Sequence, residues 1–265
     1  MQSNSELLDS LPPDQRLTGR TVVVTGSTSG IGEAVARVLA ASGATVVISG
    51  RDQTRADAVV ATIAGTGGRA VAVPVDLTAS YADLRAFAAD SRDALGGRVD
   101  VLVNNAGVYP VGATESLADV DLDTMLAVNV RAPHVLVGAL APAMAERGGG
   151  AVINIGSWMA RVGSPFGAMY TATKAALEQL TRAWSAEYGP RGVRVNTVAP
   201  GVTATPGNAD AADIVAAMTR STVAGRPVRP VDIAFAVRYL ASDEAAFVHG
   251  TTLDVDGGLL AARLG

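Results

Sequence analysis

The sequence predicts an α/β fold in which one parallel sheet is covered by helices on both faces. Two observations lead to this fold class. Short apolar runs that do not alternate with polar residues recur along the chain, as in strands buried on both faces. Segments with helical periodicity separate these runs, and strand–helix alternation of this length is typical of a doubly wound parallel sheet. Glycines and prolines mark the element ends and no change in composition indicates a linker, so we expect a single domain.

The expected elements follow one another in a regular order. The first part of the chain contains strands at 21–25, 45–48, 70–75 and 99–103, separated by helices at 31–41, 53–64 and 81–95. The second part contains a long helical region at 117–146, a strand at 151–155, a helix that carries Tyr170 and ends near Gly189, a strand at 193–198, a helical pair within 209–240 and a last strand at 252–255. Gly43 has the position of a helix C-cap.

The composition excludes several classes of function. The chain has no cysteine, which excludes disulfides, thiolate zinc sites and a cysteine nucleophile. Its two histidines, His134 and His249, are far apart in sequence, so we expect no metal site and interpret both as structural. The formal net charge is −4 without long runs of like charge, so we expect neither a nucleic-acid nor a membrane partner. No stretch of about 18 residues is uncharged and apolar enough to span a bilayer, and the first residues do not resemble a secretory signal, so we expect a cytoplasmic protein.

Lys174 is the only lysine among 21 basic residues, and Tyr170 lies four residues before it. Positions i and i+4 of a helix share one face. An ammonium about 4 Å from a phenolate stabilises it by about 4 kcal/mol at an effective dielectric near 20, which is roughly three pKa units. We therefore expect Lys174 to lower the pKa of Tyr170 towards neutrality, where a phenol can both give and take a proton. The alternative is a stray lysine in an arginine-biased composition.

A glycine-rich turn follows the first expected strand. Residues 25–32 read TGSTSGIG, with the spacing G-x-x-x-G-x-G rather than the usual dinucleotide fingerprint G-x-G-x-x-G. Glycines let the backbone turn sharply and approach a pyrophosphate, whose charge is stabilised by the N-terminus of the next helix. The turn therefore predicts a Rossmann-type nucleotide site. The alternative is an ordinary tight turn between a strand and a helix.

The end of the second strand bears on the choice of cofactor. An NAD site usually has an acidic residue there for the ribose 2′-hydroxyl, whereas this chain has Arg51 followed by Asp52. A guanidinium suits a 2′-phosphate by charge and by its fork geometry, so we favour NADP(H) over NAD(H). In the alternative, Arg51 is solvated and Asp52 caps the next helix or binds the ribose.

Five motifs together resemble the short-chain dehydrogenase/reductase family. They are the glycine turn at 25–32, Asn104-Asn105-Ala106-Gly107, Ser157, Tyr170-x-x-x-Lys174 and Pro200-Gly201, and they occur in the order seen in that family. The resemblance covers residues 19–258. Within the family, the 3-oxoacyl-carrier-protein reductases are the best general match in size and motif spacing. We expect a nucleotide-binding domain of this type at 19–265. It would follow a polar N-terminal extension at 1–18, which lies outside the resemblance and which we expect to be loosely ordered up to about residue 17.

The resemblance also implies the roles of single residues. Tyr170 matches the family's proton donor and acceptor, and Lys174 the residue that lowers the tyrosine pKa and holds the nicotinamide ribose. Ser157 matches the hydroxyl that polarises the substrate carbonyl. Asn129 matches the asparagine that completes a tetrad and anchors a water relay. The implied cofactor contacts are Gly26, Ser27, Thr28, Ser29, Gly30, Ile31, Arg51, Asp76, Leu77, Asn104, Ala106, Gly107, Tyr170, Lys174, Pro200, Gly201, Val202 and Thr203.

Several of these residues also have ordinary structural interpretations. Ser157 is placed like a helix or turn cap, and Asp76 like a routine turn residue. Ser29 stands where many NADP-preferring relatives have a basic residue, so the expectation of NADP rests on Arg51. A group of mostly apolar residues either lines a substrate pocket or packs in the ordinary way: Tyr109, Pro110, Val111, Trp158, Met159 and Met169.

The sequence thus predicts an NADP-dependent oxidoreductase that interconverts a ketone or aldehyde and an alcohol. The alternatives are an NAD-dependent dehydrogenase of another small alcohol, sugar or steroid-like substrate, and a non-catalytic module that senses NADPH. The resemblance also implies a homo-oligomer, a dimer or tetramer. It would pair through the helix before Glu146 and the Tyr170 helix, which has small and apolar residues at Ala172, Ala176, Leu180 and Ala183.

Overall fold

The computed structural model describes residues 3–12, 14–110, 112–165, 167–220 and 222–262. Within these residues, one sheet has seven parallel strands in the order β3-β2-β1-β4-β5-β6-β7. The strands are β1 (Thr21–Val24), β2 (Thr45–Ile48), β3 (Arg69–Ala72), β4 (Val101–Asn104), β5 (Gly150–Ile155), β6 (Val193–Pro200) and β7 (Thr252–Val255). The winding direction reverses between β1 and β4, and ligands of such sheets bind beyond the C-terminal strand ends at that point.

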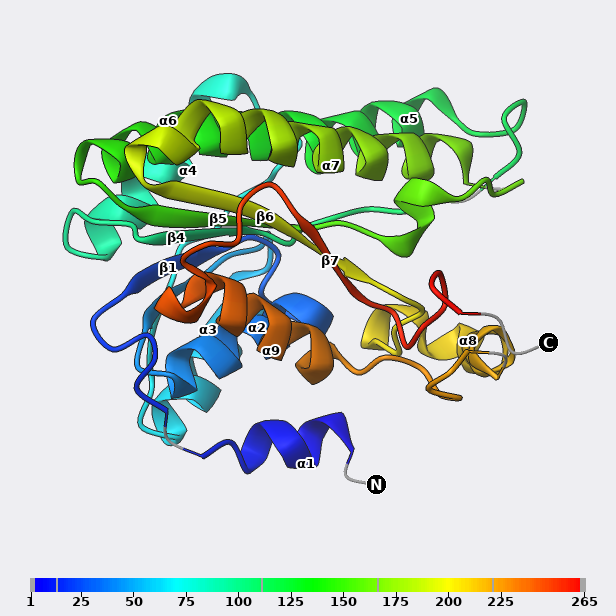
Figure 1. The fold of residues 1–265 in the computed structure, drawn as a ribbon, viewed down its shortest axis with the longest axis horizontal. Helices are drawn as coiled ribbons and strands as arrows, with labels where there is room; N and C mark the ends of the chain where they lie inside the picture. Colours follow the sequence, from blue (N-terminus) through cyan, green and yellow to red (C-terminus); the bar gives the residue numbers. More distant parts are fainter. Residues whose placement is uncertain (1–2, 13, 111, 166, 221, 263–265) are drawn as a thin grey trace.

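Helices cover both faces of the sheet (Figure 1), which confirms the predicted fold class. One layer consists of α4 (Tyr81–Ala94), α5 (Asp119–Leu126), α6 (Ala132–Glu146) and α7 (Ala168–Tyr188). The other contains α2 (Gly30–Ala41), α3 (Gln53–Gly65) and α9 (Pro230–Ala241). The predicted helical pair within 209–240 corresponds to a 3-10 turn (Pro206–Ala211) with α8 (Ala212–Thr219), followed by α9.

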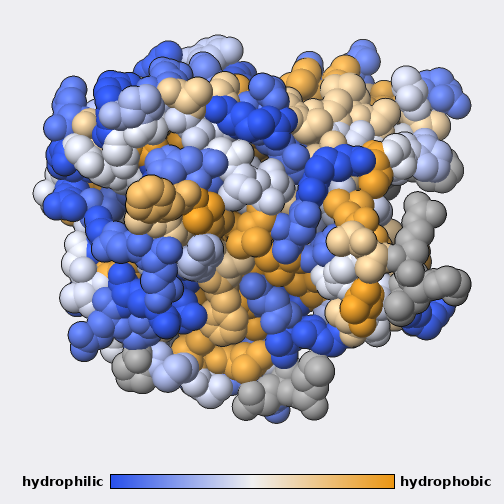
Figure 2. All heavy atoms as spheres, viewed as in Figure 1, coloured by the Kyte–Doolittle hydropathy of each residue, from blue (hydrophilic) through white to orange (hydrophobic). Residues whose placement is uncertain are grey.

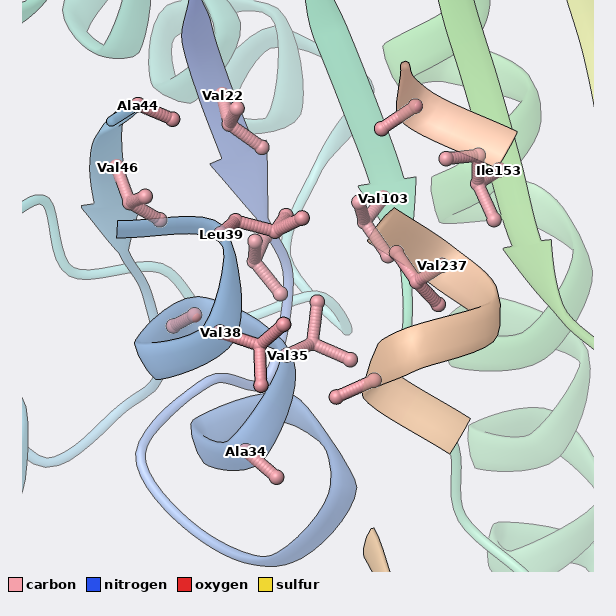
Figure 3. Packing of buried hydrophobic residues seen from close by; sticks show 14 of the residues in the cluster. Val22, Ala34, Val35, Val38, Leu39, Ala44, Val46, Val103, Ile153 and Val237 are labelled. Carbon is pink, nitrogen blue, oxygen red and sulfur yellow. The ribbon is translucent and has the colours of Figure 1, made fainter. Parts of the chain in front are cut away.

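The central strands are buried on both faces, as their apolar runs predict. Val22 packs with Val35 and Leu39 of α2 and Val237 of α9 in one core cluster (Figure 3). Val23, the next residue of β1, belongs to the cluster under α4, α6 and α7. Successive side chains of a strand point to opposite faces, so the two clusters lie on the two sides of the sheet.

The helical region predicted at 117–146 contains a five-residue π-helix, Ala127–Arg131, between α5 and α6. The sequence did not predict this change of hydrogen bonding. Single-turn π-segments inside α-helices are frequent at functional sites, and this one carries Asn129. Because it adds a residue to one turn, the π-helix changes the direction in which that side chain points.

The same helical run, Asp119–Glu146, is long and apolar enough to cross a membrane by length and composition alone. The sequence expectation considered only uncharged stretches and therefore passed over it. Because 61% of its most apolar window is buried inside the protein, the apolar residues are accounted for by the core. One such helix among the described residues indicates a membrane span only weakly.

The N-terminal segment packs against the domain, which corrects the expectation of a loosely ordered extension. Helix α1 (Asn4–Asp9) begins with a capping box between Ser3 and Glu6. Leu8 and Leu17 are buried in the core cluster of α2 and α9. Asn4 accepts a hydrogen bond from the backbone N–H of Val231 at 2.9 Å, and thereby caps α9. The segment was missed because a six-residue helix with one buried leucine has too little periodicity to be recognised.

Figure 2 shows polar atoms over much of the left of this face and more apolar atoms towards the right, the side where α8 lies in Figure 1. Ile214 and Met218 of α8 are 63% and 42% exposed, and Val223 beyond it is 58% exposed. These apolar side chains lie on the segment that follows β6. This segment starts at the C-terminal edge of the sheet.

Candidate active site

The turn after β1 requires glycine at three positions. Gly26 and Gly30 have φ values of +63° and +57°, a region that side chains other than glycine rarely adopt. A Cβ on Gly32 would lie 2.2 Å from the carbonyl oxygen of Gly26. Helix α2 begins here, and its N-cap Ser29 makes no side-chain capping bond. The first amide groups of α2 are therefore left for an anionic group, as at other helix N-termini that bind phosphate.

Residues from the end of β4 hold this turn in place. The side-chain amide of Asn105 donates to the carbonyl oxygens of Thr25 and Gly26 at 2.8 and 3.0 Å. The hydroxyl of Thr25 accepts from the backbone N–H groups of Asn105 and Ala106 at 3.0 and 3.1 Å. Asn105 was not among the predicted contacts. The motif Asn104-Asn105-Ala106-Gly107 could have indicated Asn105. Which of the two adjacent asparagines faces the turn depends on where β4 ends, and the sequence does not show that position.

The side chains of two predicted cofactor contacts are buried between the strands. Asn104 is buried, and its amide donates to Asn154 of β5 at 2.9 Å. Ser27 is also buried; its hydroxyl donates to the carbonyl of Val24 at 2.8 Å and its backbone N–H donates to Ser49 at 2.9 Å. Both side chains therefore brace the strands, although the side-chain oxygen of Asn104 is buried without a hydrogen-bond partner among the described residues. A contact of either residue with the cofactor stays a prediction.

A cavity of about 420 Å³ lies at the point where the winding reverses. Predicted contacts in its lining are Gly26, Thr28, Ser29, Gly30, Ile31, Arg51, Asp76, Leu77, Ala106 and Gly107. Lining residues that were not named as cofactor contacts include Gly50, Arg55, Val75, Thr78, Asn105, Val108, Tyr109, Thr124, Val128, Thr205 and Gly207. Most of these lie beyond the ends of β2, β3 and β4, where parallel strands bring their following loops together.

Pro200, Gly201, Val202 and Thr203 are not in this lining. A Cβ on Gly201 would lie 2.6 Å from the Cα of Asp256, so this glycine permits close packing near β7. The same segment reaches the cavity two residues later, through Thr205 and Gly207. A contact between residues 200–203 and the nicotinamide therefore stays a prediction.

Arg51 and Asp52, which follow β2, have different roles in the structure. Arg51 lines the cavity, whereas Asp52 is the N-cap of α3 and accepts from the backbone N–H of Arg55 at 3.0 Å. Across the cavity, hydrogen bonds from Thr78 hold the pKa of Asp76 below its ordinary value, with a smaller effect of Arg51. No carboxylate lies within ion-pair distance of Arg51 in the described part of the chain. The guanidinium is thus available for an anion.

The proposed catalytic side chains converge beside the C-terminal end of β5. Ser157 follows this strand and is buried, and Tyr170 lies in the first turn of α7. Lys174, one turn further along α7, is only 4% exposed and donates to the carbonyl of Ile155 at 2.8 Å. Its Nζ lies 5.9 Å from the centre of the Tyr170 ring. The hydroxyl of Ser157 also accepts from the N–H of Met159 at 3.2 Å, so the cap interpretation and a catalytic position coexist.

The protonation of this group differs from the sequence expectation. Burial raises the pKa of the Tyr170 phenol, the Ser157 hydroxyl lowers it by less as a hydrogen-bond partner, and Tyr109 raises it further. Burial also lowers the pKa of Lys174 to about 8. The expected lowering of the tyrosine pKa by the lysine is therefore wrong for the protein alone. The Coulomb argument did not include the loss of hydration that both groups undergo.

Asn129 clamps the segment that follows β4. Its side-chain oxygen accepts from the N–H of Val108 at 3.0 Å, and its amide donates to the carbonyl of Val108 at 2.9 Å and to Thr173 at 3.1 Å. A Cβ on Gly107 would lie 3.3 Å from Nζ of Lys174 and 3.5 Å from the Asn129 oxygen. Asn129 thus lies within the site. Its side-chain amide acts by direct hydrogen bonds to Val108 and Thr173. The water relay stays a prediction.

A smaller cavity of about 240 Å³ opens beside Tyr170. Two residues of the predicted apolar group, Pro110 and Met169, line it together with Leu117, Leu122 and Met125. Tyr109 packs edge-to-face on Tyr170, with ring centres 6.2 Å apart, and its hydroxyl donates to Gly207 at 3.4 Å. Trp158 and Met159 are half-buried outside the lining. Val111 lies outside the described residues.

The order and placement of these groups match known proteins. A family model described as enoyl-(acyl carrier protein) reductase matches residues 26–260. The chain belongs to the short-chain dehydrogenase/reductase family. It is accordingly an oxidoreductase that depends on a nicotinamide cofactor and acts on CH–OH groups, and the resemblance seen in the sequence is confirmed.

Three members of this family illustrate the range of relatives. D-threitol dehydrogenase of Mycolicibacterium smegmatis is 37% identical over 92% of this chain and 94% of its own length. A short-chain dehydrogenase of Burkholderia cenocepacia, solved in complex with NADP, is 37% identical with a TM-score of 0.86 over 93% of this chain and all of its own. A structure provisionally named a β-ketoacyl-ACP reductase is 44% identical with a TM-score of 0.83 over the same shares.

Proposed function

We propose that this family member is an NADP(H)-dependent reductase or dehydrogenase that interconverts a ketone or aldehyde and an alcohol. The observation that carries the proposal is the convergence of Ser157, Tyr170 and Lys174 beside a nucleotide-sized cavity. The glycines of the cavity fit a dinucleotide. A side chain on Gly32 would clash with the carbonyl oxygen of Gly26, so only glycine permits the tight turn that a pyrophosphate would approach.

Arg51 supports NADP(H) over NAD(H). Its side chain lines the cavity, and a guanidinium binds a phosphate monoester through charge-assisted, paired hydrogen bonds. Asp52, the acidic residue that could have bound a ribose hydroxyl, is engaged as the cap of α3 instead. The NADP complex of the relative from Burkholderia cenocepacia is consistent with this preference.

The side chains have distinct tasks in this proposal. When bound, NADP(H) supplies or accepts the hydride. Reduction places negative charge on the carbonyl oxygen, so Ser157 would donate a hydrogen bond to it and Tyr170 would protonate it. The buried ammonium of Lys174 would stabilise the phenolate that remains, an interaction strengthened where water is excluded. Asn129 would hold the Val108 segment against these groups.

The cavity beside Tyr170 supports a small substrate with an apolar portion. Its walls include Leu117, Leu122 and Met125, and its volume is about 240 Å³. A 3-oxoacyl substrate with a short chain fits this chemistry and agrees with the name of one solved relative. The alternative is a small alcohol or sugar, which the resemblance to D-threitol dehydrogenase favours.

An initial-rate panel of ketones, aldehydes and alcohols with both cofactors tests the proposal. The Tyr170→Phe variant should lose activity by about 100-fold or more, because it lacks the acid. Its affinity for NADPH, measured by fluorescence titration, should stay unchanged. Unaltered turnover would exclude the mechanism, whereas binding without turnover in the wild type would favour the alternative of a non-catalytic NADPH-sensing module.

We also propose a homodimer or homotetramer. A cavity of about 750 Å³ lies on the outer surface of α5 and α6, away from the catalytic side chains. On this surface Val120 is 70% exposed and Leu126 is 42% exposed, while Ala172 and Ala183 are exposed on the neighbouring α7. Small side chains allow helices to approach closely. A monomer in sedimentation at micromolar concentration would refute this assembly.

A further inference from the structure

A second polar cavity lies at the opposite edge of the sheet, beyond the N-terminal ends of β1, β4, β5 and β6. Its volume is about 390 Å³, and we call it the basal cavity. Four arginines and two aspartates line it: Arg20, Arg98, Arg147, Arg194, Asp100 and Asp243. β5 begins at this edge and ends next to Ser157, so roughly 17 Å of strand separates the basal cavity from the catalytic group.

The charges in the basal cavity do not balance. Asp243 pairs with Arg20 at 2.9 Å, and Asp100 pairs with Arg98. Asp100 is also used by Thr21, whose backbone N–H and hydroxyl donate to it at 3.0 and 3.1 Å. Four guanidinium groups therefore meet two carboxylates in the lining, although the whole chain has a net charge of −4.

Among the residues that the structure describes, the two remaining guanidinium groups bond only to backbone carbonyls. Arg147 donates to Val99 at 2.6 Å. Arg194 donates to Leu240 at 2.6 Å and to Ser242 at 3.1 Å. No carboxylate of the described residues lies within ion-pair distance of either. Burial lowers the pKa of Arg194; the nearby Asp243 counteracts part of this effect, and Arg20 adds to it. Arg194 is half-buried and Arg147 is exposed. Burial of a cation is costly where its counter-charges compensate only in part, and an anion would relieve that cost at Arg194.

We propose that the basal cavity binds a small oxyanion with two or more negative charges, such as phosphate. The cavity is large enough for such a group, and several of its guanidinium donors are not used by the bonds described above. A planar guanidinium matches two oxygens of a phosphate, which gives the site geometric preference as well as charge. The anion would also join the segments before three neighbouring strands, because Arg98, Arg147 and Arg194 precede or begin β4, β5 and β6.

Calorimetric titration with inorganic phosphate tests this site. The protein is saturated with NADP, so that the nucleotide cavity is filled, and chloride keeps the ionic strength constant. We expect one saturable site and a thermal midpoint that rises with phosphate concentration, because a ligand of the folded state stabilises it. Binding no tighter than about 10 mM would overturn the proposal.

Three variants locate the site. Arg147→Gln should weaken phosphate binding about tenfold, because it removes one charge-assisted contact. Arg147→Lys should weaken it less, since the charge stays and only the paired geometry is lost. Arg92→Gln, on the exposed surface of α4, should bind like the wild type. Equal weakening in Arg92→Gln and Arg147→Gln, or none in Arg147→Gln, would contradict a site in the basal cavity. Because binding is the readout, these results do not depend on turnover.

Discussion

The ammonium of Lys174 donates to the backbone carbonyl of Ile155 at 2.8 Å, two residues before Ser157. This bond joins α7 to the end of β5 and so fixes the lysine and the serine relative to each other. It also places the ammonium in an interior position, where burial lowers its pKa to about 8. The site therefore has a lysine that can lose its proton near the working pH, which an arginine cannot do.

Lys174 should make the stability of the protein depend on pH. Its pKa of about 8 in the folded protein lies below the ordinary 10.5, so the unfolded chain binds more protons between these values. The free energy of unfolding should rise with pH across this window, by on the order of 3 kcal/mol. Denaturant unfolding of the wild type and of Lys174→Met, compared from about pH 7.5 to about pH 10.5, measures this. Parallel pH profiles would show that the lysine is not buried as described.

Gly32 should tolerate no side chain. In Gly32→Ala the new Cβ would meet the carbonyl of Gly26 at 2.2 Å, so the turn must move. We expect a loss of stability of roughly 1–3 kcal/mol or more and weaker NADPH binding. The matched control is Gly65→Ala in α3, where nothing lies within 4 Å of the new Cβ and the change should be neutral or slightly stabilising. Equal effects at both positions would contradict the proposal that the glycine turn at 25–32 binds the cofactor.

Arg51 should set the preference between the two cofactors. Arg51→Ala should raise the KM for NADPH about 10- to 100-fold, as expected for loss of a hydrogen bond to a charged group. The KM for NADH should change little. Arg92→Ala, away from the cavity, is the control. If Arg55→Ala gives the same loss, the 2′-phosphate lies against α3 instead of at the end of β2.

Arg161 should act as a positioning residue for Ser157. It ends the 3-10 turn that Ser157 begins, donates to Asp254 of β7 and lies 3.6 Å from the buried Glu178 of α7. In Arg161→Gln the turn loses these ties, so kcat should fall about tenfold through misplacement of the hydroxyl while NADPH affinity is kept.

A change in the pH profile of kcat would distinguish this role from general destabilisation. Burial already raises the pKa of Glu178, and Arg161 counteracts part of that rise. Removing the guanidinium should raise the pKa further. Arg92→Gln, on the exposed surface of α4 and not among the groups that act on Glu178, should leave both kcat and its profile unchanged; the same loss there would count against positioning by Arg161.

Local patterns were enough for the fold class and for the main site. Buried strands such as β1 have unbroken apolar runs, and the glycine turn and the Tyr170–Lys174 pair each lie within eight consecutive residues. Features that depend on distant partners were missed. Helix α1 is recognisable only by its contacts with α9, and Asn105 by bonds to residues 79 and 80 positions away.

The sequence by itself determined that a phenol and the chain's only lysine share one face of a helix, after a turn that only glycines can form. The tertiary structure decided their protonation. Packing β5 against α7 buries Lys174 and half-buries Tyr170. In the protein alone, the loss of hydration raises the pKa of the phenol and lowers that of the ammonium. Spacing along a helix indicates which groups can meet, whereas their pKa values depend on how far the rest of the chain excludes water from them.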